Sequence, residues 1–496
     1  MNIMSPVASS SALDSDYLLS APKDDETFPT FERRVSSRGL VSKYNDEFVL
    51  KNTDKSYEQQ YASLYFLRLT VLKPRVAKVA ADAWNGMSIL SQQVKAVDRV
   101  LDVRQGEFCW IVGTIYIEMS LKPNILDEIT KEFWTTAPIS KDKFVDPERD
   151  AIMLEDESGR VNLVGSTTIK SELLVTGCVV AVLGSETTSG DFDVVDIRYP
   201  ELAPQLPREV SSGHDRKYVA LVSGLEVSGD VHESYETTML FEYLMGELGG
   251  SDDSKHASEI IHVIVAGNSF PNRDGPLSRD EDSQDDNSSQ TKKKKYGYDS
   301  KSYNSKPTEA LDSLLADLST SVSVDIMPGE QDPTNYSYPQ QPISPALVPR
   351  TRRFVQSTFR SVSNPCWWDI EGLRILGTGG QPINDIFRYI EGDDRLQMME
   401  YTLRWQHCAP TAPDTLWSYP FRDCDPFILN ETPHLFFAGS QPEFKTKILE
   451  GDDGQRVRLV TLPKFSETGQ VVLVDVDTLA CEVVTFALHG ARRRDS

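Results

Sequence analysis

The alternation of apolar and polar positions divides the chain into stretches with different periods. Residues 1–55 are polar, rich in Ser and Asp, and show no period, so we predict a flexible tail there, with order beginning near Tyr57. Over residues 57–72 apolar side chains recur at the spacing of one helical face, and Pro74 is expected to break or kink that helix. The same period resumes over residues 76–84. The sequence therefore predicts a helical pair that packs beneath the next domain.

Short apolar blocks separated by turn residues replace the helical period from Glu107 onward. The turns at 157–160 and 189–191 are typical of hairpins, and a helical-looking connection lies around 123–133. Five short strands fit a small closed Greek-key barrel of the OB type, within a domain that we place at residues 56–210 together with the helical segment. The predicted strands span residues 108–117, 151–154, 161–164, 173–183 and 191–197.

A second domain is expected over residues 215–490, where buried strands alternate with helices. This alternation is typical of a layered α/β core, and further strands are predicted after Cys366. A polar insertion at 271–306 interrupts the domain and need not fold. The first strands are predicted at 218–222, 260–266 and 322–327, with helices at 236–248 and 310–318 between them.

Charge and cysteine content limit the classes of function. The 496 residues include 51 Lys and Arg against 75 Asp and Glu, a net charge of -24. That sign disfavours direct binding to a phosphate backbone, so the barrel is better suited to binding protein or to a structural role. No apolar run approaches the ~20 residues of a membrane span. Six scattered cysteines without a C-x-x-C pair indicate a reducing compartment, cytosol or nucleus. Basic clusters at 292–295, 350–353 and 492–494 are either import signals or solvated loops.

The chemistry of the second domain depends on the loops that follow its strands. A two-metal phosphoesterase needs Asp, Asn and His there to hold two ions about 3.5–4 Å apart. The order of these loops resembles that of the calcineurin-like metallophosphoesterases, but hydroxyl, amide and apolar residues stand where that family has most of its ligands. The sequence therefore predicts a dismantled site without a metal or cofactor. The vestigial positions are Ser223, Leu225, Asn268, Glu330, Gln331, Asp332, His407, Ser440 and Pro442.

Several longer segments carry a more specific resemblance, which covers residues 56–488. In order along the chain, they resemble the signature segments of the small, or B, subunits of eukaryotic DNA polymerase delta. The carboxy-terminal segments are 332–343, 377–381, 409–416 and 425–428, and the amino-terminal ones are 61–68, 154–157 and 174–177.

The resemblance implies a mixture of α+β and all-β structure, in which an OB-type barrel packs on an inactivated two-sheet α/β/β/α calcineurin-like phosphoesterase domain. It implies a non-catalytic nuclear scaffold in DNA replication and repair. Such a protein joins the cysteine-rich C-terminal domain of the catalytic subunit to a third subunit that links the enzyme to the sliding clamp, and it also serves polymerase zeta. It needs little direct contact with DNA and none with a membrane.

Two alternatives stay open at the level of the sequence. One is a divergent metal-dependent phosphoesterase or nuclease that uses Asp332, Asn268 and His407. The other is the B-subunit of another replicative polymerase, alpha or epsilon.

The signature loops hold the residues that we consider for contacts with partners. Three prolines stiffen the loop at 332–342, and the side-chain amides between them can hydrogen-bond neighbouring backbone without a metal. These loops either brace the core or contact a partner directly. Trp367, Trp368 and Trp405 are likewise either interface anchors or core aromatics. The candidate contacts are Asp332, Pro333, Asn335, Pro339, Gln341, Thr411, Pro413 and Asp414.

Overall fold

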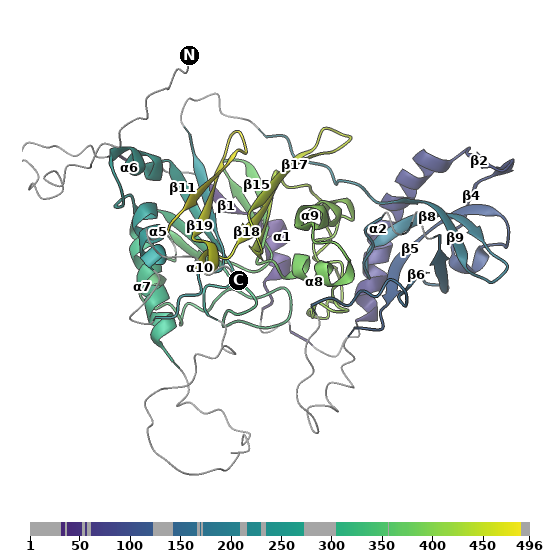
Figure 1. Cartoon of the computed structure of the whole chain (residues 1–496), viewed down its shortest axis with the longest axis horizontal. Coiled ribbons are helices and arrows are strands. Elements are labelled where there is room, and N and C mark those ends of the chain that lie inside the picture. Colours follow the sequence, from purple (N-terminus) through teal and green to yellow (C-terminus); the bar gives the residue numbers. More distant parts are fainter. Residues whose placement is uncertain are drawn as a thin grey trace, which may run out of the picture.

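A computed structural model shows two neighbouring bodies along the long axis of the molecule (Figure 1). One is a closed β-barrel with a long helix, which we call the barrel. The other holds two larger sheets with their helices, and we call it the two-sheet body. The structure describes residues 31–34, 37–51, 55–56, 61–122, 142–165, 169, 172–208, 216–229, 235–271, 304–355 and 357–487.

Five strands close the barrel in the order β5-β6-β7-β9-β8, with β8 pairing back onto β5. Neighbours are antiparallel except β7 and β9, which run parallel. The predicted closed barrel and its two hairpin turns are confirmed. The strands are β4 (Lys95–Ala96), β5 (Phe108–Glu118), β6 (Ala151–Glu155), β7 (Arg160–Val164), β8 (Val179–Glu186) and β9 (Phe192–Arg198), beside a small hairpin of β2 (Ser88–Ile89) and β3 (Gln92–Gln93) and the 3-10 turn η1 (Val100–Asp102).

One predicted barrel strand begins later than expected. Residues 173–178 form a buried turn, and β8 starts only after it. Gly177 in this turn has φ +92°, a left-handed conformation that a strand does not contain. The helical connection predicted at 123–133 lies outside the described residues.

The predicted helical pair is wrong, because α2 (Ala62–Trp84) is one continuous helix that includes Pro74. Its buried face runs through Leu64, Leu72 and Val76 without interruption, and it packs on β5 and β8. Pro74 itself lies on the exposed side. Burial of the apolar face therefore offsets the backbone hydrogen bond that proline cannot make.

The predicted flexible tail is wrong for residues 38–48. β1 (Arg38–Leu40) pairs antiparallel with β14, and α1 (Ser42–Phe48) follows it. Asn45 of α1 donates from Nδ2 to the Trp367 carbonyl at 2.7 Å and accepts from the Trp367 N–H at 2.9 Å. A segment this short shows no sequence period, and its partners lie more than 300 residues away along the chain. The other domain boundaries stay predictions.

Two six-stranded sheets form the two-sheet body. The first has the order β13-β12-β11-β10-β19-β20, and its β10 to β13 are parallel. The second has the order β1-β14-β15-β16-β18-β17, and its β15, β16 and β18 are parallel. The strands are β10 (Tyr218–Val222), β11 (Ile260–Ala266), β12 (Ser323–Met327), β13 (Phe359–Ser361), β14 (Cys366–Ile370), β15 (Leu373–Thr378), β16 (Leu435–Gln441), β17 (Lys445–Glu450), β18 (Arg456–Pro463), β19 (Gln470–Asp475) and β20 (Cys481–Thr485).

The two sheets pack face to face, and helices cover their outer faces. Val219 and Leu221 of β10 lie in the core between the sheets, whereas Ala220 and Val222 lie in the core beneath α5 and α7. Helices α8 and α9, with α1 and the barrel, cover the other sheet. The predicted layered α/β core is confirmed, although most of the insertion predicted at 271–306 lies outside the described residues. The helices are α5 (Tyr235–Met245), α6 (Ser251–Ser258), α7 (Lys306–Ser321), α8 (Gln381–Tyr389), α9 (Arg395–Arg404) and α10 (Phe465–Thr468), with the 3-10 turn η4 (Thr351–Phe354).

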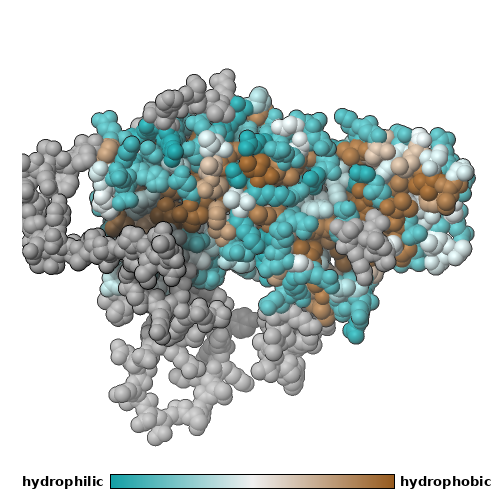
Figure 2. Space-filling model, turned by 45° about the horizontal axis from the view of Figure 1, so that its top comes forward, coloured by the Kyte–Doolittle hydropathy of each residue, from teal (hydrophilic) through white to brown (hydrophobic). Residues whose placement is uncertain are grey.

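The large aromatic side chains of the two-sheet body belong to its core. Trp367, Trp368 and Trp405 are at most 2% exposed, so the core interpretation is confirmed and the interface-anchor interpretation is wrong. On the face in Figure 2, hydrophilic residues predominate and hydrophobic residues form separate patches. No helix within the described ranges is long and apolar enough to cross a bilayer.

Candidate functional site

The carboxyl ends of parallel strands from both sheets meet at one edge of the two-sheet body. β10 leads into Ser223, β11 into Asn268 and β12 into the loop that contains Asp332, while the end of β16 supplies Ser440. Ligand sites in open α/β sheets form at such an edge. Four of the predicted vestigial positions therefore lie close together.

Ser223 connects three strand ends. Its hydroxyl donates to the Ala266 carbonyl at 2.6 Å and accepts from the Ser440 N–H at 2.9 Å. The side chain is fully buried. Where the resemblance to phosphoesterases calls for a metal-binding carboxylate, this chain has a hydroxyl that links the two sheets.

Asn268 and Ser440 are bonded to each other across the same edge. Asn268 Nδ2 donates to Ser440 Oγ at 2.9 Å, and Asn268 Oδ1 accepts from the Gln331 N–H at 3.1 Å. Both residues have left-handed backbones, with φ of +53° for Asn268 and +51° for Ser440. Such conformations are uncommon outside glycine, and here the two turns are joined by side chains that bond each other.

Asp332 is a buried carboxylate at this edge, and both of its oxygens accept backbone N–H groups. Oδ1 accepts from the Phe270 N–H at 3.0 Å and Oδ2 from the Gly329 N–H at 2.7 Å. Burial raises the pKa of Asp332 to about 6, against the opposing effect of these backbone donors. The side chain holds together the loops after β11 and β12.

Glycines bring the backbones of these loops into direct contact. A Cβ on Gly439 would lie 2.4 Å from the Ala266 carbonyl oxygen and 2.6 Å from Ser223 Oγ. A Cβ on Gly380 would lie 2.0 Å from the Gly439 carbonyl oxygen. The space at the centre of the strand ends is therefore filled by main chain.

An amide network extends the site toward the signature loops. Gln340 Oε1 accepts from Asn364 Nδ2 at 3.0 Å and from Gln381 Nε2 at 2.8 Å. Gln340 Nε2 donates to the Gly329 carbonyl at 2.9 Å. The predicted bonding of loop amides to neighbouring backbone is confirmed by Gln340, whereas the bonds from amide to amide were missed.

These donors do not fit a two-metal centre. Hydroxyls and amides bonded to one another supply few of the anionic ligands that two divalent ions require, and both oxygens of Asp332 accept backbone N–H groups. Within the described ranges no group of three or more His, Cys, Asp or Glu side chains could hold a metal ion.

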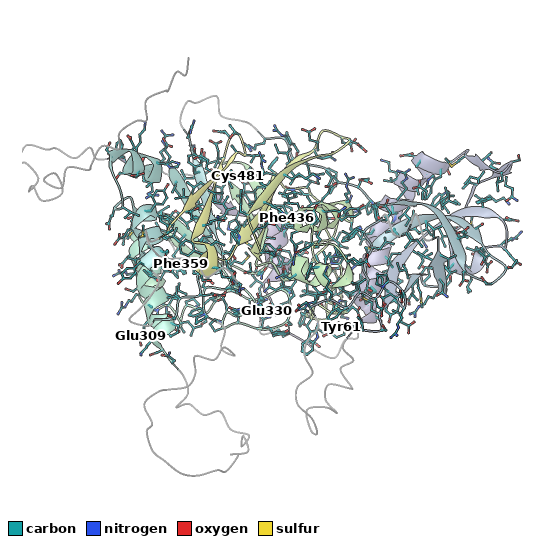
Figure 3. The ribbon with its side chains drawn as sticks, in the orientation of Figure 1. Tyr61, Glu309, Glu330, Phe359, Phe436 and Cys481 are labelled. Atoms are coloured by element: carbon teal, nitrogen blue, oxygen red, sulfur yellow. The ribbon has the colours of Figure 1, made fainter. Side chains whose placement is uncertain are left out.

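The remaining vestigial positions lie apart from these contacts. Leu225 is buried in the core beneath the helices of the first sheet. Glu330 and Pro442 are exposed, and Figure 3 shows Glu330 at the edge of the two-sheet body.

His407 does not join Asn268 and Asp332. Its Nε2 lies 2.9 Å from Asp425 Oδ2, and its Nδ1 accepts from the Ala409 N–H at 3.2 Å, so Nε2 carries the proton. Burial and the neighbouring Arg68 lower the pKa of His407 to about 4. The sequence placed this histidine in the wrong loop cluster, because its position depends on Asp425, which is in turn held by Arg68 of the distant helix α2.

Comparison with known proteins adds the decisive observation. A family model described as the DNA polymerase delta subunit OB-fold domain matches residues 60–197, and a model of the B subunits of DNA polymerases alpha and epsilon matches residues 219–446. The DNA polymerase delta small subunit of Arabidopsis thaliana is 38% identical over 435 residues, which cover 86% of this chain and 91% of the relative. This chain belongs to the DNA polymerase delta small-subunit family.

Two further delta small subunits show similar likeness. That of Oryza sativa is 36% identical over 448 residues, covering 89% of this chain and 96% of the relative. That of Saccharomyces cerevisiae is 35% identical over 499 residues, covering 92% of this chain and 95% of the relative. The family resemblance inferred from the signature segments is confirmed, and so is the OB-fold assignment of the barrel. The alternative assignment to the alpha or epsilon B-subunits is not supported by these relatives.

Three signature segments of this delta small-subunit chain converge on Arg68 of α2. Its Nε donates to Asp425 Oδ2 at 2.8 Å, and its other nitrogens donate to the carbonyls of Pro410 and Ala412, both at 2.7 Å, and of Gly177 at 3.1 Å. Arg68 and Asp425 are both fully buried. The guanidinium therefore joins the barrel to two loops of the two-sheet body. The signal missed in the sequence was an arginine placed on the apolar face of a helix.

The candidate partner contacts are mostly internal. Asp414 accepts from the Tyr389 hydroxyl at 2.9 Å and pairs with Lys122, and Thr411 is fully buried. Asn335 Oδ1 accepts from the Gln341 N–H at 2.7 Å, and Gln341 Nε2 donates to the Phe48 carbonyl at 2.9 Å. Pro339 is buried, whereas Pro333 and Pro413 are half-buried.

Proposed function

We propose that this chain is a non-catalytic accessory subunit of DNA polymerase delta, built from an OB-fold barrel on an inactivated calcineurin-like phosphoesterase domain. The observation that carries the proposal is the bonding at the strand ends, where Ser223, Asn268 and Ser440 bond one another and Asp332 bonds the backbone. Side chains used in this way join loops and sheets. Among the described residues, they leave no pair of open carboxylates for general acid–base or metal chemistry at this edge.

The partners that we propose follow from membership in the delta small-subunit family. The chain would bind the cysteine-rich C-terminal domain of the catalytic subunit and a third subunit that links the enzyme to the sliding clamp, and it would also serve polymerase zeta. This role places the chain in the nucleus. A net charge of -24 suits a protein that docks other proteins and leaves DNA to its partners.

Assembly is tested by co-expressing the full chain with the C-terminal domains of the delta, alpha and epsilon catalytic subunits. We expect the delta complex alone to survive purification at moderately high salt. Survival of the alpha or epsilon complex in its place would refute the assignment.

Absence of catalysis is tested with the purified chain, manganese, bis-p-nitrophenyl phosphate and single-stranded DNA. We expect the wild-type chain to hydrolyse either substrate no faster than the Asp332→Asn variant does. Metal-dependent turnover that Asp332→Asn abolishes would show that the edge is an active site, whatever the chain assembles with.

A further inference from the structure

A hollow next to the bonded strand ends, lined in part by the signature loops, is a feature that the proposed scaffold role leaves unused. The space in it that a water-sized molecule can occupy is about 80 Å³. Its walls come from the loop after β12, from α8 and from the loop that ends at Trp417. Figure 3 shows Glu330, at its rim, on the same lower margin of the molecule as Tyr61 of the barrel helix segment.

Two exposed aromatic rings line this hollow. Tyr336 is 69% exposed and Trp417 is 56% exposed, and their ring centroids lie 5.6 Å apart at 82°. Within the described ranges Trp417 is the one exposed tryptophan. Exposed Trp and Tyr that line a concavity are the residue types on which binding energy at protein interfaces concentrates.

The backbone beneath these rings is held firmly. The Trp417 carbonyl accepts from the Tyr338 N–H at 2.7 Å, and the Tyr338 carbonyl accepts from the Tyr419 N–H at 2.9 Å. Tyr338 is buried and stacks on Phe427 at 5.3 Å. The two loops thus present their aromatic side chains from a fixed platform, which lowers the entropy cost of binding.

Carboxylates outnumber cations around the rings. Glu330 is exposed, with no hydrogen bond or ion pair to another described residue. Asp385 is buried and accepts from the Thr415 hydroxyl at 2.5 Å, while its other oxygen lies 3.7 Å from Arg388. Burial and the nearby Glu330 raise the pKa of the Tyr336 phenol. The hollow therefore combines aromatic faces with an unpaired negative charge.

We propose that this hollow is the docking site for an arginine side chain on a segment of a partner subunit. A planar guanidinium stacks on aromatic rings and forms charge-assisted hydrogen bonds to a carboxylate, and Tyr336, Trp417 and Glu330 offer these groups. The inference rests on the proposed function, because it takes another component of the polymerase as the partner. It also moves the partner contact from the buried residues of the signature loops to the exposed ring of Tyr336 in one of them and of Trp417 directly after another.

The test uses the full chain co-expressed with the polymerase delta catalytic subunit and third subunit. We expect Trp417→Ala and Glu330→Lys each to weaken retention of one of these subunits at least tenfold, without a change in melting temperature. Tyr235→Ala, at a ring that is 68% exposed elsewhere, and Glu148→Lys, the same charge change on the barrel, are matched controls that should retain both subunits. Equal retention by the site variants and the controls would overturn the docking site.

The outcomes separate this inference from the proposed function. If the wild-type chain retains neither subunit, the scaffold role fails; if wild type and site variants both retain them, the docking site alone fails. A photo-crosslinking phenylalanine analogue in place of Tyr336 then tests whether the docked side chain is an arginine. We expect a crosslink to a partner segment with an arginine within a few residues. A crosslink to a segment without an arginine would refute the assignment of the docked side chain.

Discussion

At the scale of single residues, Arg68 carries a positive charge into a space with no exposure to solvent. Its donors meet one carboxylate and three carbonyls, so the desolvated charge is compensated by Asp425 and by the loop backbone. A buried ion pair contributes modest net stability, but loss of one partner leaves the other charge unpaired.

Replacing Arg68 with Met should therefore lower the free energy of unfolding by about 3–5 kcal/mol. Asp425 would stay buried without its guanidinium partner, and three loop carbonyls would lose a donor. Urea denaturation followed by circular dichroism measures the change. Arg160→Met is the control, because Arg160 pairs with Glu155 in the barrel with both side chains nearly half exposed, and its loss should cost less than about 1 kcal/mol. Equal effects of the two variants would contradict the role of Arg68.

His407 should make stability depend on pH. Its pKa in the folded chain is about 4, below the ordinary value near 6.5, so the unfolded chain binds a proton first as the pH falls. This contribution is fully present above pH 6.5 and is lost as the pH falls toward 4. Thermal melts between pH 7 and 4 should show a steeper loss for wild type than for His407→Gln, whose amide can donate to Asp425 without titrating. Parallel curves would contradict the prediction.

Sequence reasoning grouped the residues of the strand ends correctly and misplaced the histidine. Ser223, Asn268 and Ser440 follow buried strands, and the carboxyl ends of parallel strands meet at one edge, so a strand pattern suffices to bring them together. His407 lies in an irregular loop after α9, and the Asp425 carboxylate that it bonds is held by Arg68 of α2, more than 300 residues earlier in the chain. No local pattern carries that contact.

At the scale of elements, α2 shows packing prevailing over local propensity. A proline inside a helix removes one backbone hydrogen bond and crowds the carbonyl four residues earlier, which for Pro74 belongs to Thr70. The apolar face on either side of Pro74 packs on one barrel, so the helix continues. The sequence predicted both halves of this helix. They form one continuous helix because both pack on the same barrel, which the local sequence does not show.

Replacing Pro74 with Ala should stabilise the protein by about 1–3 kcal/mol, since alanine restores the amide donor and costs nothing in packing at an exposed position. Chemical denaturation of the full chain measures the gain. Pro307→Ala is the matched control: Pro307 lies in the first turn of α7, where the N–H has no helical partner, so we expect little change. Destabilisation by Pro74→Ala would show that the helix depends on a bend at the proline.

At the scale of the whole molecule, the barrel and the two-sheet body share one core. A single cluster of buried side chains includes Ile115 and Val180 of the barrel together with Trp405 and Phe436 of the other body. Periodicity predicted each body separately. It could not predict the shared core, because that core is built from loops and faces that lie far apart in the sequence.

A shared core predicts one cooperative unfolding transition for the wild-type chain. Gly177 is the position at which a substitution should uncouple the barrel from the two-sheet body. A Cβ there would lie 2.1 Å from the Pro410 carbonyl oxygen and 2.6 Å from Arg68, so Gly177→Ala must separate the barrel turn from the loop. Gly190→Ala is the matched control, because Gly190 has a similar φ of +87° but open space around its Cβ. Gly190→Ala therefore places alanine in a similar left-handed backbone conformation, but without a steric clash of its Cβ.

Calorimetry should give a single endotherm for wild type and for Gly190→Ala, with agreement between calorimetric and van't Hoff enthalpies. For Gly177→Ala we expect the barrel and the two-sheet body to unfold in separate steps, because the Arg68 contacts that join them are lost. Two transitions already present in wild type would show that the bodies are independent, and the signature segments would then need a role other than joining them. A single transition in Gly177→Ala, shifted no further than in Gly190→Ala, would show that the turn carries no coupling.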